Sequence, residues 1–349
     1  MRETEMASDQ ATTPCEQQEE SRLPFLASAR SPQRPAFMTT IGAPLLEARE
    51  SSPRGPLERR EERLAWLMLL PVVLALLALG VYPVLSTLWF SFQQGGSFGL
   101  GTTSAGLANY LRLLHDEQFW SALRFSLLYS LVTVCGQMLC GTALALFANR
   151  RFHGRWLARA AILFPWAIPT ATNSVIWAYM FNDQYGLINS LLEHLGLLNP
   201  THPIVWLGSA QLATLLIYVL AIWKANSLVA LLVLAGLQGI PEEVYEAARV
   251  DGASRWQILW RVTLPLLRPV LLVTLILRTI ESLQAFDLIS AFTNGGPGNA
   301  TQNLGLYIYL QIQQFGDFGY GSTIAVVLTA ITLLFIVLYM RTLLRTGTR

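Results

Sequence analysis

The chain has 349 residues, of which 53% are hydrophobic and only 13% are charged, and its formal net charge is +2 at pH 7. Soluble globular domains carry about twice this share of charged residues, so the composition indicates that lipid surrounds most of the chain. A nucleic-acid partner would need a strongly basic patch, and so small a net charge gives that class of function no support.

Residues 1–60 differ from the rest of the chain because they are rich in Glu, Arg, Ser, Gln and Pro and have little apolar periodicity. Such a segment cannot bury enough apolar surface to fold, so we expect a disordered cytoplasmic tail. Met38 is an alternative start, and the sequence leaves the choice between Met1 and Met38 open.

Six apolar stretches are long enough, as helices, to cross a bilayer core of about 30 Å, which requires about 20 residues. The sequence therefore predicts an all-α membrane protein with six transmembrane helices. The first stretch follows a basic cluster and contains Ala78-Leu79-Gly80, which resembles a signal-peptide cleavage site. We expect that it is retained, because the apolar run continues to Phe92. The six stretches are residues 64–92, 121–148, 160–181, 207–237, 263–286 and 322–343.

Arginine is distributed unevenly between the two sides of the predicted membrane. With the N-terminus inside, the outer loops at 93–120, 182–206 and 287–321 contain one arginine, Arg112, whereas fourteen lie on the cytoplasmic side. Short cytoplasmic loops hold an excess of Lys and Arg, so the sequence predicts an N-in, C-in topology. The fourteen are Arg59, Arg60, Arg63, Arg150, Arg151, Arg155, Arg159, Arg249, Arg255, Arg261, Arg268, Arg341, Arg345 and Arg349.

Metal and redox chemistry have little support. Cys15, Cys135 and Cys140 show no paired spacing, and the four histidines are scattered through connecting segments without an H-x-x-x-H pair. Cys135 and Cys140 lie in an apolar run that is typical of small core residues. We expect no metal site and no disulfide framework.

The connection between the fourth and fifth stretches carries its own helix signals. Pro241 suits a first helical position, the acidic pair after it suits the positive end of a helix, and Gly252 suits the left-handed residue after the C-terminus. Ser254 with Gln257 is a capping box that would open the next helix. A helix lying on the membrane surface would need a larger apolar face and more basic residues. We expect a short cytoplasmic docking helix.

The same segment carries a family signature. Glu246-Ala247-Ala248, Gly252, Val262 and Leu264-Pro265 match E-A-A-x3-G-x9-[IV]-x-L-P. The chain thus resembles the membrane subunits of binding-protein-dependent ABC importers. In that family this helix is the coupling helix, which sits in a cleft of the ATPase subunit and transmits nucleotide-driven closure. By resemblance, the ATPase-coupling residues are expected to be Glu246, Ala247, Ala248, Asp251, Gly252, Leu264 and Pro265.

Other segments resemble the carbohydrate branch of these permeases, closest to the maltose/trehalose-type first permease subunit. They are Trp223 to Pro241, Thr293 to Pro297 with Thr301, Tyr307 to Tyr309, and Phe318 to Gly321. The resemblance covers roughly residues 60–345. It implies a MetI-like permease core at 120–345 with a coupling helix at about 241–253, after a tail at 1–60 and a first transmembrane helix with its outer loop at 61–119.

The resemblance also implies the function and the partners. The chain is expected to be a permease subunit of an ATP-driven importer of a sugar, a di- or oligosaccharide, delivered by an extracytoplasmic binding protein. Two copies of an ABC ATPase and a second permease subunit would complete it in the plasma (inner) membrane of a bacterium or archaeon. No enzymatic activity and no cofactor are expected in this chain, since ATP and Mg would be bound by the ATPase. The identity of the sugar and the nature of the permease pair stay open.

Ionisable side chains inside a span cost about 2.5–3.5 kcal/mol each and usually face a cavity or a partner. Lys224, Arg278 and Glu281 are such residues, and the last two are placed to pair with each other along one helix face. The resemblance places sugar contacts on the helix before the coupling loop and on the helix after it. Trp177 and Asn173 are weaker candidates, more typical of packing and of hydrogen bonds between helices. The expected substrate-binding residues are Trp223, Lys224, Ala225, Leu228, Arg278, Glu281, Ser282, Gln284 and Ala285.

Three other classes of function are disfavoured. A self-contained ATP-driven pump would need a G-x-x-x-x-G-K-[ST] loop, and the one lysine of the chain, Lys224, follows Trp223. A secondary sugar transporter is the alternative, but it would predict inverted repeats, which the sequence does not display. An intramembrane hydrolase would need a motif such as G-x-S-x-G or H-E-x-x-H, and neither occurs.

Overall fold

The computed structural model describes residues 56–95, 103–199 and 201–346, and within these ranges the side chains of residues 64–342. The chain divides into two compact units, Met1–Leu69 and Leu70–Arg349. Of the first unit, the described part is the beginning of helix α1, Pro56–Leu76. Most of the expected disordered tail therefore lies outside the described residues. The expectation is wrong for residues 56–60, where Pro56 opens a helix of good helix formers.

Five helical segments among the described residues are long and apolar enough to cross a membrane, and they match five of the six predicted stretches. Three of them are single helices, namely α4 (Glu117–Ala148), α8 (Ala210–Gln238) and α14 (Phe318–Thr346). The other two are Leu64–Phe90 and Arg255–Leu283, and each contains a π-helical turn. They consist of α1, η1 (Leu77–Val81) and α2 (Tyr82–Phe90), and of α10 (Arg255–Ile258), η2 (Leu259–Thr263) and α11 (Leu264–Leu283).

The remaining predicted stretch, residues 160–181, is broken, so the expectation of one continuous spanning helix there is wrong. It forms α5 (Arg155–Ala167) and α6 (Thr170–Met180), which have 13 and 11 residues, each too short to span alone. Ile168 and Pro169 between them are extended, with ψ angles of 130° and 138°. Proline has no N–H and disfavours helical geometry in the residue before it, which accounts for the break.

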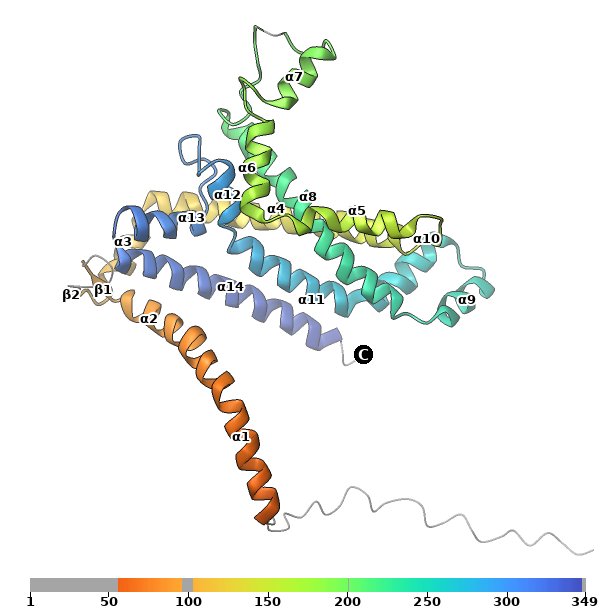
Figure 1. The fold of residues 1–349 in the computed structure, drawn as a ribbon, viewed down its shortest axis with the longest axis horizontal. Coiled ribbons are helices and arrows are strands. Elements are labelled where there is room, and N and C mark those ends of the chain that lie inside the picture. Colours follow the sequence, from red (N-terminus) through yellow and green to blue (C-terminus); the bar gives the residue numbers. More distant parts are fainter. Residues whose placement is uncertain (1–55, 96–102, 200, 347–349) are drawn as a thin grey trace, which may run out of the picture. The chain divides into compact units, whose positions relative to one another are not determined.

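The other elements are short, and most lie in the connections between the long helices (Figure 1). The two strands pair in antiparallel fashion, with Gln93 opposite Ser104. The short elements are β1 (Gln93–Gln94), β2 (Thr103–Ser104), α3 (Ala108–Leu114), α7 (Leu187–His194), α9 (Glu242–Val250), α12 (Asp287–Phe292), α13 (Leu304–Tyr309) and η3 (Leu310–Gln314).

Helices α4, α8 and α11 pack on one another in the second unit, and the most extensive contact joins α4 to α8 (Figure 1). Gly141 of α4 is in close contact with α8, because a Cβ atom added to it would lie 2.5 Å from Cβ of Val229. Small residues at such crossings let two helix backbones approach each other. The polar residues that these three helices carry are consequently brought together.

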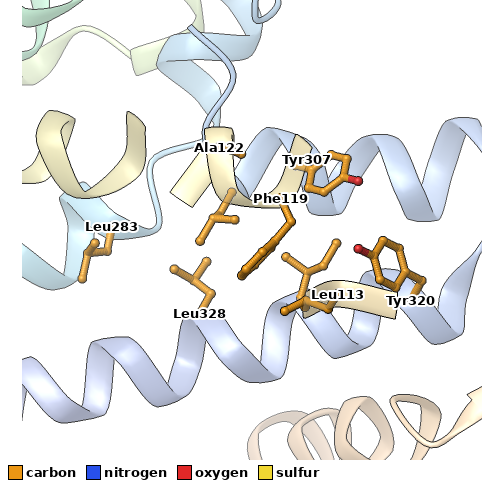
Figure 2. Packing of buried hydrophobic residues seen from close by; sticks show 9 residues of the cluster. Leu113, Phe119, Ala122, Leu283, Tyr307, Tyr320 and Leu328 are labelled. Carbon is orange, nitrogen blue, oxygen red and sulfur yellow. The ribbon is translucent and has the colours of Figure 1, made fainter. Parts of the chain in front are cut away.

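A buried cluster joins α3, α4, α13, α14 and the end of α11, and in Figure 2 Phe119 lies near its centre with Tyr307 and Tyr320 to one side. Both tyrosine hydroxyls donate to Oδ2 of Asp116, the N-cap residue of α4, and the distance from Tyr307 is 2.5 Å. Burial raises the pKa of Asp116, but hydrogen bonds from the two tyrosines and from two backbone N–H groups bring it below its ordinary value. One carboxylate therefore fastens three helices together.

Candidate functional site

A cavity of about 620 Å³ lies between α4, α8, α11 and the break between α5 and α6. Its lining mixes polar and charged groups with aromatic rings, which is the composition expected of a small-molecule site. Seven of the nine residues predicted to bind substrate line it. Two come from α8 and the rest from the end of α11 and the turn that follows: Lys224, Ala225, Arg278, Glu281, Ser282, Gln284 and Ala285.

Arg278 is held in place from two sides. Its Nε donates to Oε1 of Gln137 on α4 at 2.9 Å, and its Nη1 donates to Oε2 of Glu281 one helical turn along α11. The Arg278 side chain is only 9% exposed, whereas that of Glu281 is 54% exposed. The expected pairing of Arg278 with Glu281 is confirmed. Because Glu281 keeps much of its surface open to the cavity, it remains available to accept hydrogen bonds from a ligand.

Lys224 is partnered by backbone carbonyl groups at the end of α5, whereas Arg278 is partnered by side chains. Its Nζ donates to the carbonyl oxygen of Ile168 at 2.6 Å and lies 3.5 Å from that of Pro165. Unpaired carbonyls gather at a helix C-terminus, where the helix dipole also favours a cation. The charge of Lys224 is thus offset by backbone carbonyl groups without a carboxylate partner.

Two predicted substrate residues lie outside the cavity. Trp223 packs in the buried cluster around Leu220 and Ile289, and its ring centroid lies 5.5 Å from that of Trp177. Leu228 is half-buried and does not line the cavity. Trp177 packs as expected, whereas Nδ2 of buried Asn173 has no hydrogen-bond partner among the described residues, so the bond expected between helices is missing from that atom.

The cavity also contains residues that the sequence did not single out. Gln137 and Tyr129 come from α4, and the wall formed by the helix break consists of Trp166 to Thr170, while Asp287 opens α12. Gln137 is a buried amide inside an apolar run, and Pro169 follows closely on Pro165. These two signals were present in the sequence, but neither shows which distant residue it meets.

The predicted coupling segment is also present. α9 covers Glu242–Val250 with no buried residue, and Gly252 has a φ of +75°, the expected left-handed conformation. Ser254 and Gln257 form the predicted capping box. Pro241 is the N-cap residue rather than the first helical one, because its ψ of 141° is extended. The segment offers an exposed surface: Glu246, Ala247, Asp251 and Gly252 are exposed and Ala248, Leu264 and Pro265 are half-buried.

The described lining of the cavity includes no Cys or His; its polar groups are hydrogen-bonding and charged side chains such as Gln137, Lys224 and Glu281. Among the described residues, no group of three or more His, Cys, Asp or Glu side chains gathers where a metal ion could be held. Long apolar helices around a polar cavity, together with an exposed capped helix in one connection, define a helical membrane permease.

The chain belongs to the family described as "Binding-protein-dependent transport system inner membrane component", which it matches over residues 137–349. The resemblance drawn from the Glu246 to Pro265 signature is thereby confirmed. The chain is 40% identical to a trehalose/maltose transport system permease protein of Thermococcus litoralis, with 82% of this chain and 95% of the relative covered. It is 39% identical to a sulfoquinovosyl glycerol transport system permease protein of Agrobacterium fabrum, with 82% and 92% covered.

Solved structures agree on the fold. The chain resembles one chain of a bacterial ABC transporter involved in the import of the acidic polysaccharide alginate, with a TM-score of 0.73 and 21% identity over 83% of this chain and 98% of that one. A second structure of the alginate transporter, in complex with an alginate pentasaccharide-bound periplasmic protein, gives a TM-score of 0.71 at 22% identity, with 81% and 94% covered. The helical arrangement is therefore that of an ABC importer permease.

Proposed function

We propose that this chain is a permease subunit of an ATP-driven importer and that it moves a sugar through the cavity between α4, α8 and α11. The observation that carries the proposal is the gathering of seven of the nine predicted substrate residues around one cavity. Relatives named as trehalose/maltose and sulfoquinovosyl glycerol permeases support a glycoside as the cargo. Arg278 and Lys224 are both already partnered, which favours a ligand bound through hydroxyl groups over a strongly anionic one.

The proposed assembly has one further permease subunit, two ATPase subunits that bind ATP and Mg, and an extracytoplasmic binding protein that delivers the sugar. The exposed residues of α9, with Gly252 after it, form the surface on which an ATPase subunit docks. ATP-driven closure moves this helix and turns the cavity toward the outside, and hydrolysis returns it inward. No covalent chemistry takes place in this chain.

The proposed topology has six crossings with both termini in the cytoplasm. α5 and α6 together form the broken crossing, while the five long segments supply the others. This orientation puts the arginine-rich connections inside, as the distribution of positive charge favours. A reporter fused after Arg349 and another inserted in the 182–206 connection would then lie on opposite sides of the membrane.

Glu281 provides the test of the cavity. In proteoliposomes containing the whole importer and its binding protein, Glu281→Ala is expected to abolish uptake of radiolabelled trehalose or maltose, because the open carboxylate of the cavity is lost. Glu281→Gln keeps the side-chain shape and is expected to retain part of the uptake. The control is Glu117→Ala, which removes an exposed carboxylate outside the cavity lining.

All three variants should co-purify with the ATPase, since the cavity does not include the coupling segment. Unchanged uptake by Glu281→Ala would contradict the assignment of the cavity as the transport site. An importer that moves neither disaccharide but transports another glycoside would leave the site assignment standing and correct the cargo.

A further inference from the structure

The break between α5 and α6 leaves backbone groups without their usual partners. The carbonyl oxygen of Pro165 would accept a bond from the N–H four residues later, but residue 169 is proline and has none. Ile168 is extended, so its own carbonyl also lies outside the helical hydrogen-bond pattern. In a membrane such groups need a partner, either from the protein or from water in a cavity, because lipid offers none.

Lys224 of α8 supplies the missing donor to this break. Its ammonium nitrogen is 2.6 Å from the carbonyl oxygen of Ile168 and 3.5 Å from that of Pro165. An ammonium group is a compact cation with three donors, so it can converge on two carbonyl oxygens, whereas a planar guanidinium spreads its donors apart. Lys224 is the one lysine among 24 basic residues of the chain, and it stands where this geometry is needed.

The two arms of the broken helix have different main partners. α5 packs mainly against α8, whereas α6 packs mainly against α12 and also contacts α8 through Trp177 and Trp223. The residues from Trp166 to Thr170 that join the arms form one wall of the cavity. Two arms with different main partners, joined by two extended residues, form a hinge, because a change of a few backbone angles at these residues reorients one arm against the other.

We propose that Lys224 is a positioning residue of the transport site: it fastens the Ile168-Pro169 hinge to α8 and so fixes the cavity wall that this hinge forms. Its role in transport rests on the proposed function, but its effect on the hinge does not. The ammonium group acts on the backbone of α5, and the wall it fixes then meets the cargo. Loss of the ammonium group frees the hinge before any ligand enters.

The test measures amide hydrogen exchange in the whole importer, reconstituted in lipid nanodiscs without sugar or nucleotide. Lys224→Met keeps the unbranched shape and most of the length of the side chain, and it removes the donor. It is expected to speed exchange of the first hydrogen-bonded amides of α6, residues 173–176, about tenfold, since hydrogen bonds to charged groups are stronger than neutral ones. Amides within α14 serve as the internal control and should not change.

A double-mutant cycle with Pro169→Ala isolates the cause. Alanine restores an N–H that can bond the carbonyl of Pro165, so Lys224→Met in that background should change exchange by no more than about twofold. Should Lys224→Met fail to assemble with its partners, Lys224→Gln replaces it in the same cycle; its neutral amide group can still donate hydrogen bonds, and it is expected to give about a threefold effect.

Three results would overturn the proposal: unchanged exchange at residues 173–176, an equal increase in both backgrounds, or an increase spread through α14 as well. Reduced uptake by Lys224→Met with unchanged exchange would assign Lys224 to direct contact with the cargo and would also overturn it, while leaving the sugar importer intact. Conversely, a wild-type importer that carries no sugar would refute the proposed function without altering the exchange result.

Discussion

Gly141 lies at a close contact between α4 and α8, so Gly141→Ala provides a direct test of this packing. The new Cβ would lie 2.5 Å from Cβ and 2.6 Å from Cγ1 of Val229, and 2.9 Å from the backbone oxygen of Asn226. Carbon atoms pack at about 3.5–4.0 Å, so the helices must separate by roughly 1 Å. Neither a branch-point carbon nor a backbone oxygen can move aside alone.

Gly136→Ala on the same helix is the matched control. Its Cβ would meet Cδ1 of Ile222 at 2.4 Å and Cγ1 at 2.9 Å, the far end of a side chain that can change rotamer. Both substitutions gain about 1 kcal/mol of helix propensity, so the difference between them isolates the packing cost. Overpacking costs about 1–3 kcal/mol, and a rotamer adjustment about 0.5–1.5 kcal/mol.

We therefore expect Gly141→Ala to be less stable than Gly136→Ala by about 1–2 kcal/mol, with a melting temperature several degrees lower. The measurement is thermal unfolding: the purified importer is heated to a series of temperatures, and the fraction that still elutes as an intact complex in size-exclusion chromatography is recorded. If Gly141→Ala melted at or above the temperature of Gly136→Ala, the close approach of the two helices described here would be refuted.

The remaining predictions concern the two ends of the permease. Gly252→Val should prevent the importer from retaining its ATPase during purification, because valine is strained in the left-handed conformation of the residue after α9. Gly196→Val is the control: Gly196 follows α7 with a φ of +69°, close to the +75° of Gly252, so the strain is similar, but the importer should still retain its ATPase. Equal retention by both variants would argue against docking at α9. Asp116→Asn should lower stability at neutral pH, because the carboxylate that accepts from Tyr307 and Tyr320 is lost. Since the pKa of Asp116 is lowered by folding, its contribution is complete above its ordinary value of 3.8 and disappears as the pH falls below it. Between about pH 5 and pH 3 the wild type should therefore lose more stability than Asp116→Asn, and parallel pH profiles would contradict this assignment.

Local rules were sufficient for the segment between α8 and α11. The acidic first turn, the left-handed Gly252 and the capping box of Ser254 with Gln257 all depend on residues within a few positions of one another. For the same reason, the five long helices followed from hydropathy, since lipid imposes a length that can be counted along the chain.

Proline shows where such local rules end. Pro71 and Pro269 lie inside α1 and α11 without interrupting them, whereas Pro169 separates α5 from α6. What distinguishes the last case is a tertiary partner. Lys224, which lies 55 positions after Pro169 in the sequence, donates hydrogen bonds to the carbonyl groups that the break exposes. No rule confined to neighbouring residues could have identified that partner.

In the cavity, too, some residues could be predicted from the sequence and others could not. The charged residues of α8 and α11 were recognisable because charge inside a span is costly. Gln137 was not, because its role depends on Arg278, which is 141 positions away in sequence. Trp223 was expected to offer its ring to a sugar, yet it packs against Trp177, since a large aromatic side chain is readily buried between helices.

The π-helical turn η2 at Leu259–Thr263 leads into the same continuous segment that carries Arg278 and Glu281. Such a turn accommodates one residue more than an α-helix does, so it rotates everything after it by about 100°. A chain that lost one residue of this turn would keep its helix and its hydropathy, but Arg278 and Glu281 would be turned away from the cavity.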